Sequence, residues 1–200
     1  MKVSSLVTAA VLCALGTAAM AQDTTAQPSQ RTSGSMDQGT AMDHSKTDKS
    51  DSKLTSESFA KKAAAAGLAE VEMGKLGAQK ATSPEVKKYA EEMVTDHTKG
   101  NKDLMAAAKG KTDELPSKPD MMHKAMMEKF EHQKADKEFD QDFVAQMVKD
   151  HQKVIELYEQ ASTDPGVDPQ LQAVAKKTLP TLREHLKEAQ SMQKQLTASD

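Results

Sequence analysis

Four segments of this chain carry an apolar stripe whose members recur every three or four residues, and one ionisable residue lies near the middle of each stripe. Such spacing places a stripe on one side of an α-helix. The stripes are Phe59, Ala63, Ala66, Glu70, Met73 and Gly77; Val86, Ala90, Met93, His97, Gly100 and Leu104; Val144, Met147, His151, Val154, Tyr158 and Ala161; and Leu171, Ala175, Thr178, Leu182, His185, Ala189, Met192 and Leu196. Strand patterns are absent from the sequence. We therefore predict an all-α protein, an antiparallel four-helix bundle whose helices pack through these stripes.

Capping and helix-breaking residues indicate where the helices begin and end. We expect long helices over about 56–80, 84–109, 137–161 and 168–196, and a short extra helix over about 120–134, between the second and the third. The second and fourth begin at Ser83-Pro84 and Asp168-Pro169, where a capping residue precedes a proline, as is typical of helix starts.

The beginning of the chain has the composition of an export signal. Lys2 precedes an apolar run over residues 3–18, and Ala19-Met20-Ala21 resembles a cleavage site. We therefore predict a signal peptide over 1–21, a disordered polar leader over 22–54 and a bundle domain over 55–197. No later segment approaches the roughly 18 apolar residues of a membrane helix. These features predict an exported, periplasmic and soluble protein without a transmembrane segment after signal removal.

Charge and cysteine usage limit the possible functions. The formal net charge is -3 and no cluster of lysine and arginine occurs, so nucleic acid is not expected as a partner. The only cysteine, Cys13, lies within the predicted signal. A metal site in the exported protein would therefore use histidine, carboxylate or methionine side chains.

The four ionisable residues of the stripes are the candidate functional site. Where four helices pack side by side, their midpoints meet, and Glu70, His97, His151 and His185 would point toward one interior level. A buried charge is costly unless it is paired or ligated. Three imidazoles and one carboxylate suit a divalent transition metal such as zinc, copper or iron. Asp96 and Asp150, which directly precede His97 and His151 in the sequence, could accept hydrogen bonds from neighbouring rings.

Two other interpretations of these residues remain open. They could form a metal-free polar layer that sets helix register in a structural or stress-related interaction module. They could also form an enzyme site with an open metal position. Glu-x-x-His does not occur, which argues against a di-iron carboxylate centre, and no serine–histidine–aspartate elbow is recognised. We therefore expect a non-catalytic protein.

Methionine is a second unusual feature, with 13 copies. Met121, Met122, His123, Met126 and Met127 lie close together in sequence, and thioether and imidazole groups suit Cu(I). Alternatively, Met122 and Met126 are simply part of the core, because methionine fills gaps between small residues.

Four segments in this order resemble the bacterial family called domain of unknown function 4142. They are Ala65–Ala81, Tyr89–His97, Phe139–His151 and Leu179–Leu186, and the resemblance covers about residues 55–197. It implies an exported protein with a ferritin-like four-helix fold, and the ionisable residues of the stripes fall within these segments. It implies no activity.

Overall fold

The computed structural model describes residues 53–198, which form five α-helices and no strand. The helices are α1 (Ser56–Lys80), α2 (Pro84–Ala108), α3 (Met121–His132), α4 (Lys137–Thr163) and α5 (Pro169–Ala198). Each predicted helix is present, and its ends agree with the prediction to within two residues. The all-α prediction is therefore confirmed.

The helix starts follow the predicted capping chemistry. At α1, the Thr55 hydroxyl accepts a hydrogen bond from the Ser58 amide at 3.1 Å, and the Ser58 hydroxyl accepts one from the Thr55 amide at 3.0 Å. These bonds satisfy amides that have no partner within a helix. Leu54 and Phe59 flank this cap and lie in the same buried cluster, as a hydrophobic staple requires. At α2, the Ser83 hydroxyl accepts a hydrogen bond from the Val86 amide.

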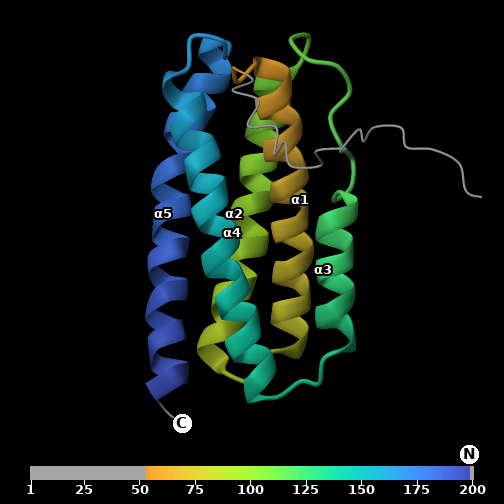
Figure 1. Cartoon of the computed structure of the whole chain (residues 1–200), viewed down its shortest axis with the longest axis vertical. Coiled ribbons are helices and arrows are strands. Elements are labelled where there is room, and N and C mark those ends of the chain that lie inside the picture. Colours follow the sequence, from red (N-terminus) through yellow and green to blue (C-terminus); the bar gives the residue numbers. More distant parts are fainter. Residues whose placement is uncertain (1–52, 199–200) are drawn as a thin grey trace, which may run out of the picture. The chain divides into compact units, whose positions relative to one another are not determined.

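Two helical hairpins make the bundle (Figure 1). Short loops join α1 to α2 and α4 to α5, while α2 packs against α5 and α1 against α4. Residues 109–136, which include α3, run back from the end of α2 to the opposite end of the bundle, where α4 begins. Neighbouring long helices are consequently antiparallel, and α2 and α4 run in the same direction. One long crossover is also the connection of ferritin-like folds, and a ferritin-like classification remains a prediction.

The core has two apolar clusters. The Phe59 cluster contains Phe59, Leu104, Tyr158 and Leu171 among others, and the Phe143 cluster contains Phe143 together with Met73, Met93 and Met147. Along every long helix, the ionisable residue of the stripe falls between members of the first cluster and members of the second. A polar layer therefore separates the two halves of the core.

Small residues on α1 allow its neighbours to approach closely. A Cβ atom at Gly74 would lie 2.9 Å from the backbone oxygen of Ala90 on α2. A Cβ atom at Gly77 would lie 2.5 Å from the ring of Phe143 on α4. Packing thus accounts for glycines that weaken the helix by roughly 1 kcal/mol each.

Helix α3 lies outside the four-helix bundle, beside α1 (Figure 1). The Nζ atom of Lys80 donates to the carbonyls of Phe130 and Glu131, at 2.8 and 2.7 Å, which holds the last turn of α3. Phe130 is the buried residue of this helix. Of the two methionines interpreted as core, Met126 is partly buried against the Phe143 cluster. For Met122 that interpretation is wrong: its exposed fraction is 74%, because the first turn of α3 lies over a cavity rather than over packed side chains.

The predicted signal over 1–21 and nearly all of the predicted leader lie outside the described residues. Within residues 53–198, no helix contains an apolar stretch long enough to span a bilayer.

Candidate metal centre

The four ionisable residues of the stripes lie together at the level between the two apolar clusters. Glu70 projects from α1, His97 from α2, His151 from α4 and His185 from α5. Their exposed fractions are 4, 8, 0 and 4% respectively. Because each occupies the middle of its stripe, the packing that buries the stripes also buries these four polar side chains.

The three imidazole rings form a nearly regular triangle. The ring centroids are 5.6 Å apart for His97 and His151, 5.3 Å for His97 and His185, and 5.5 Å for His151 and His185. One nitrogen from each ring lies within 4.8 Å of the other two. Nitrogen ligands on a tetrahedral zinc ion are about 3.3 Å apart, so ring movements on the order of 1 Å would bring them to bonding distance.

Each ring uses one nitrogen for a hydrogen bond. His97 Nδ1 lies 2.9 Å from Glu70 Oε2, and His151 Nδ1 lies 2.8 Å from the backbone oxygen of Met147. His185 Nε2 lies 3.2 Å from Asp96 Oδ2. Carboxylate and carbonyl oxygens only accept, so these three nitrogens carry protons. In a neutral ring, the opposite nitrogen then holds a lone pair.

The opposite nitrogens are buried and have no hydrogen-bond partner. They are Nε2 of His97, Nε2 of His151 and Nδ1 of His185. Glu70 Oε1 is likewise buried without a hydrogen bond, and it lies 3.9 Å from His151 Nδ1. Each unsatisfied buried polar atom costs about 1–3 kcal/mol. Four of them in one small region indicate a place for a cation or for shared protons.

The protonation of the layer centres on Glu70 and His97. Burial opposes ionisation of Glu70, but the charges of His97 and His151 outweigh it and lower the pKa of Glu70 from 4.5 to about 2. Burial likewise disfavours charged His97, but the carboxylate of Glu70 outweighs it and raises the His97 pKa. Burial and the charge of His97 lower the pKa values of His151 and His185. At neutral pH the layer therefore holds one ion pair beside two neutral imidazoles, and His151 is charged only in the acidic range where Glu70 itself titrates.

The two aspartates that adjoin histidines in the sequence have different roles. Asp96 accepts from His185, which confirms the expectation for that residue. The expectation is wrong for Asp150, whose two carboxylate oxygens both lie 2.9 Å from Gln146 Nε2. Asp150 is about 100° round the helix from His151 and lines a cavity beside α3 instead.

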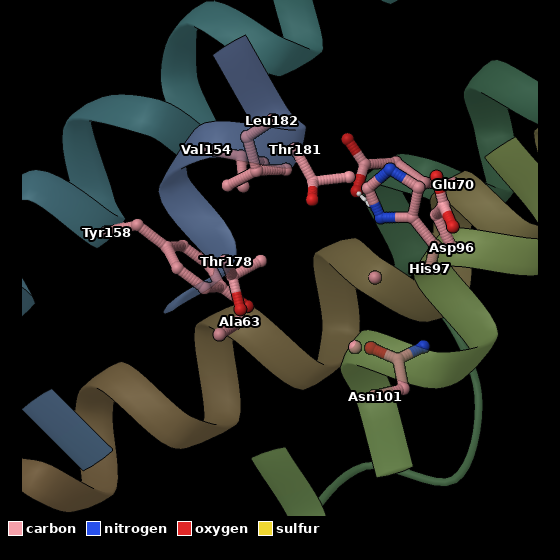
Figure 2. Close-up of a pocket in the computed structure, with 12 residues that line it drawn as sticks. Ala63, Glu70, Asp96, His97, Asn101, Val154, Tyr158, Thr178, Thr181 and Leu182 are labelled. Carbon is pink, nitrogen blue, oxygen red and sulfur yellow. Dashed lines mark ion pairs between the residues drawn. The ribbon is translucent and has the colours of Figure 1, made fainter. Parts of the chain in front are cut away.

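A small cavity adjoins the layer between the four long helices (Figure 2). Its volume is about 20 Å³, and its lining includes Glu70, His97, Asn101 and Thr181. Gly67 and Gly100 also line it, and a Cβ atom at Gly67 would lie 2.0 Å from the Asn101 side chain. A space of this size holds about one water molecule. On this side, an organic substrate would not fit beside the histidines.

Tyr89 is a member of the site that the stripes did not identify. Its ring centroid lies 6.1 Å from that of His185, and its hydroxyl is buried without a hydrogen bond. Burial raises the pKa of this hydroxyl above its usual range. The available signal was its position eight residues before His97, which places both on one side of α2.

One comparison with known proteins finds a match that covers nearly all of residues 53–198. A family model described as Domain of unknown function (DUF4142) matches residues 40–192, a range that contains all four residues of the layer. No curated protein and no solved structure was found to match the chain.

Proposed function

We propose that this chain, which belongs to the family described as Domain of unknown function (DUF4142), binds one divalent transition metal ion between its helices. The protein ligands are the unpartnered nitrogens of His97, His151 and His185. The protein is a binding protein rather than an enzyme, and it acts after export to the periplasm. N-terminal sequencing of the exported protein tests the last point, with Gln22 as the expected first residue.

One observation carries the metal proposal. Each of the three buried rings has one nitrogen held by an acceptor and the other nitrogen free. Histidines that bind metals have this arrangement, because the acceptor fixes the tautomer and the ring orientation and makes the free nitrogen more basic. A layer selected only for neutrality would not need three buried ring nitrogens without a hydrogen-bond partner, and binding of a metal ion would release the second proton of His97.

Glu70 has a double role in this proposal. Its Oε2 atom orients His97, and its Oε1 atom is available as a fourth ligand or as a partner for metal-bound water. Its negative charge also offsets part of the charge of a divalent ion in a region of low dielectric constant. Three imidazoles with one carboxylate suit zinc, copper(II) or iron(II).

The test is the metal content of protein exported and purified without added chelator, measured by mass spectrometry, together with thermal unfolding of chelator-treated protein after addition of Zn²⁺ or Cu²⁺. We expect about one ion per chain and a raised melting temperature. His185→Gln should abolish both effects. His132→Gln is the matched control, because His132 is exposed at the end of α3. Metal content well below one per chain without a thermal shift would contradict the proposal.

A metal-free structural role is the second candidate, and the ion pair between Glu70 and His97 favours it, because that pair already neutralises the layer. In that case the layer fixes the register of the helices in an interaction module. His151→Leu distinguishes the two. The structural role predicts that this variant keeps its fold or gains stability with no change in metal content, whereas the metal site would lose its ion.

A further inference from the structure

A second and much larger cavity lies between α1, α3 and α4. Its volume is about 450 Å³, within the range of roughly 300–1,000 Å³ that is typical of small-molecule sites. Its apolar wall includes Ala69 and Met73 from α1, Met126 from α3 and Leu157 from α4. Methionine side chains are flexible and polarisable, so such a wall adapts to ligands of different shapes.

A buried carboxylate lies in the wall of this cavity. Asp150 has an exposed fraction of 9%, and Gln146 supplies two hydrogen bonds to it from one neutral amide nitrogen. The ion pairs found among residues 53–198 do not include Asp150. Lys62 and Lys153 also line the cavity, but both are exposed to solvent. A buried carboxylate that lacks a cationic partner is costly, and a ligand could supply that partner.

A second buried carboxylate lines the cavity, and its ion pair with His97 offsets its charge. Glu70 lines this cavity as well as the small one, and its buried Oε1 atom has no hydrogen-bond partner. The imidazole of His123 also lines the cavity and is bonded through Nδ1 to Asp120 at 2.8 Å. Asp150 is thus the buried charged group of the wall that has no ion pair among residues 53–198, and its negative charge disfavours an anionic ligand.

We infer that this cavity binds a small primary amine with an apolar body. The ammonium group donates hydrogen bonds to Asp150, and the apolar body lies against Met73, Met126 and Leu157. A neutral analogue would leave Asp150 without a cation, and an anionic analogue would add repulsion. This inference goes beyond metal binding and does not require a metal ion among the histidines.

The test compares three probes that differ only in the head group: 4-phenylbutylamine, 4-phenylbutanol and 4-phenylbutyrate. Each is titrated into the protein with chelator present, and methionine methyl resonances are followed by NMR. We expect the amine to bind at least about tenfold more tightly than the other two. Shifts should concentrate on Met73, Met122 and Met126, which line the cavity, and should spare Met93.

Two variants and one control test whether the amine binds in this cavity at Asp150. Asp150→Asn should weaken amine binding at least about tenfold. Ala66→Leu should weaken it by filling the cavity while keeping the carboxylate, which covers the case that Asp150→Asn does not fold. Glu156→Gln, an equal charge change at an exposed position of α4, should have no effect.

Equal binding of the three probes, shifts at other methionines, wild-type affinity in Asp150→Asn or Ala66→Leu, or no binding up to about 10 mM would each overturn the inference. Because chelator is present throughout, failure here leaves the proposed metal site untouched. Conversely, absence of metal would not alter the result of this titration.

Discussion

At the level of single residues, the contact between Glu70 and His97 sets the charge state of the polar layer. Both side chains are buried, and their oxygen and nitrogen atoms lie 2.9 Å apart. Separately, each charge would be disfavoured by burial; together they stabilise each other. His151 and His185 also lie near carboxylates, at 3.9 Å from Glu70 Oε1 and 3.2 Å from Asp96 Oδ2, but burial outweighs these contacts and lowers the pKa values of both rings. One carboxylate therefore divides three similar histidines into one charged ring and two neutral rings.

This pair predicts how stability depends on pH in metal-free protein. The pKa of Glu70 is about 2 in the fold and about 4.5 when unfolded, so its contribution is present above about pH 4.5 and is lost as the pH falls toward 2. That contribution is on the order of 3 kcal/mol. The lowered pKa values of His151 and His185 also reduce the stability of the fold as the pH falls below about 6.5. The raised pKa of His97 acts oppositely, because its contribution is lost as pH rises.

Urea unfolding of the wild type and of Glu70→Gln between pH 5 and pH 2.5 measures the effect. We expect the wild type to be the more stable at pH 5 and the difference to shrink as the pH falls. Glu91→Gln, at an exposed position of α2 and outside the ion pairs found among residues 53–198, should leave the profile unchanged. Parallel profiles for the wild type and Glu70→Gln would show that Glu70 does not carry this pH dependence.

At the level of helices, the four stripes form the buried faces, and glycines on α1 allow the neighbouring helices to approach closely. The same residue type nevertheless has different roles at different positions. Gly77 faces Phe143 on α4, whereas no atom lies within 4 Å of a Cβ atom built at Gly100 in α2. Sequence spacing alone placed both glycines on stripes, so it could not distinguish close packing from open space.

Gly77→Ala and Gly100→Ala should change stability in opposite directions. At Gly77 the added methyl group would lie 2.5 Å from a fully buried ring, and such overpacking costs about 1–3 kcal/mol. At Gly100 the methyl group meets nothing, and the helix gains up to about 1 kcal/mol from alanine. Urea unfolding of both variants checks this, and changes of the same sign would be inconsistent with the packing described here.

Helix α3 shows where prediction from the sequence reached its limit. Its position and length follow from the capping residue Asp120 and from its apolar spacing. Met122, which was interpreted as part of the core, is exposed. Periodicity identifies the side of a helix that can be buried. Whether that side is buried depends on a neighbouring element along the whole helix, and α3 packs against such a neighbour mainly near Phe130.

At the level of the whole molecule, the polar layer interrupts a core that would otherwise be continuous. The Phe59 cluster and the Phe143 cluster lie on opposite sides of it, yet α1, α2, α4 and α5 each contribute to both. A helix that loses its packing in one half loses backbone hydrogen bonds that continue into the other half. The two halves should therefore unfold together.

The two tyrosines of the chain offer a direct test, because no tryptophan is present. Tyr89 belongs to the Phe143 cluster and Tyr158 to the Phe59 cluster. Tyrosine fluorescence of Tyr89→Phe and of Tyr158→Phe thus reports one half each. For each variant, we expect the urea midpoint by fluorescence to coincide with its midpoint by circular dichroism. Midpoints that differ between the two methods would show that the halves unfold independently.

The sequence by itself determined the local part of this protein: five helices, their ends, their buried faces and one ionisable residue at the middle of each long helix. These features follow from the 3.6-residue period and from capping, which involve neighbours in the chain. Only the tertiary structure decided that Glu70 pairs with His97, that Asp96 and not Asp150 contacts a ring, and that Asp150 lines a cavity. Such contacts depend on the rotation and the axial offset of each helix against the others. The packing of side chains from distant segments, such as Phe143 against Gly77, sets this rotation and offset. A local sequence pattern does not specify either of them.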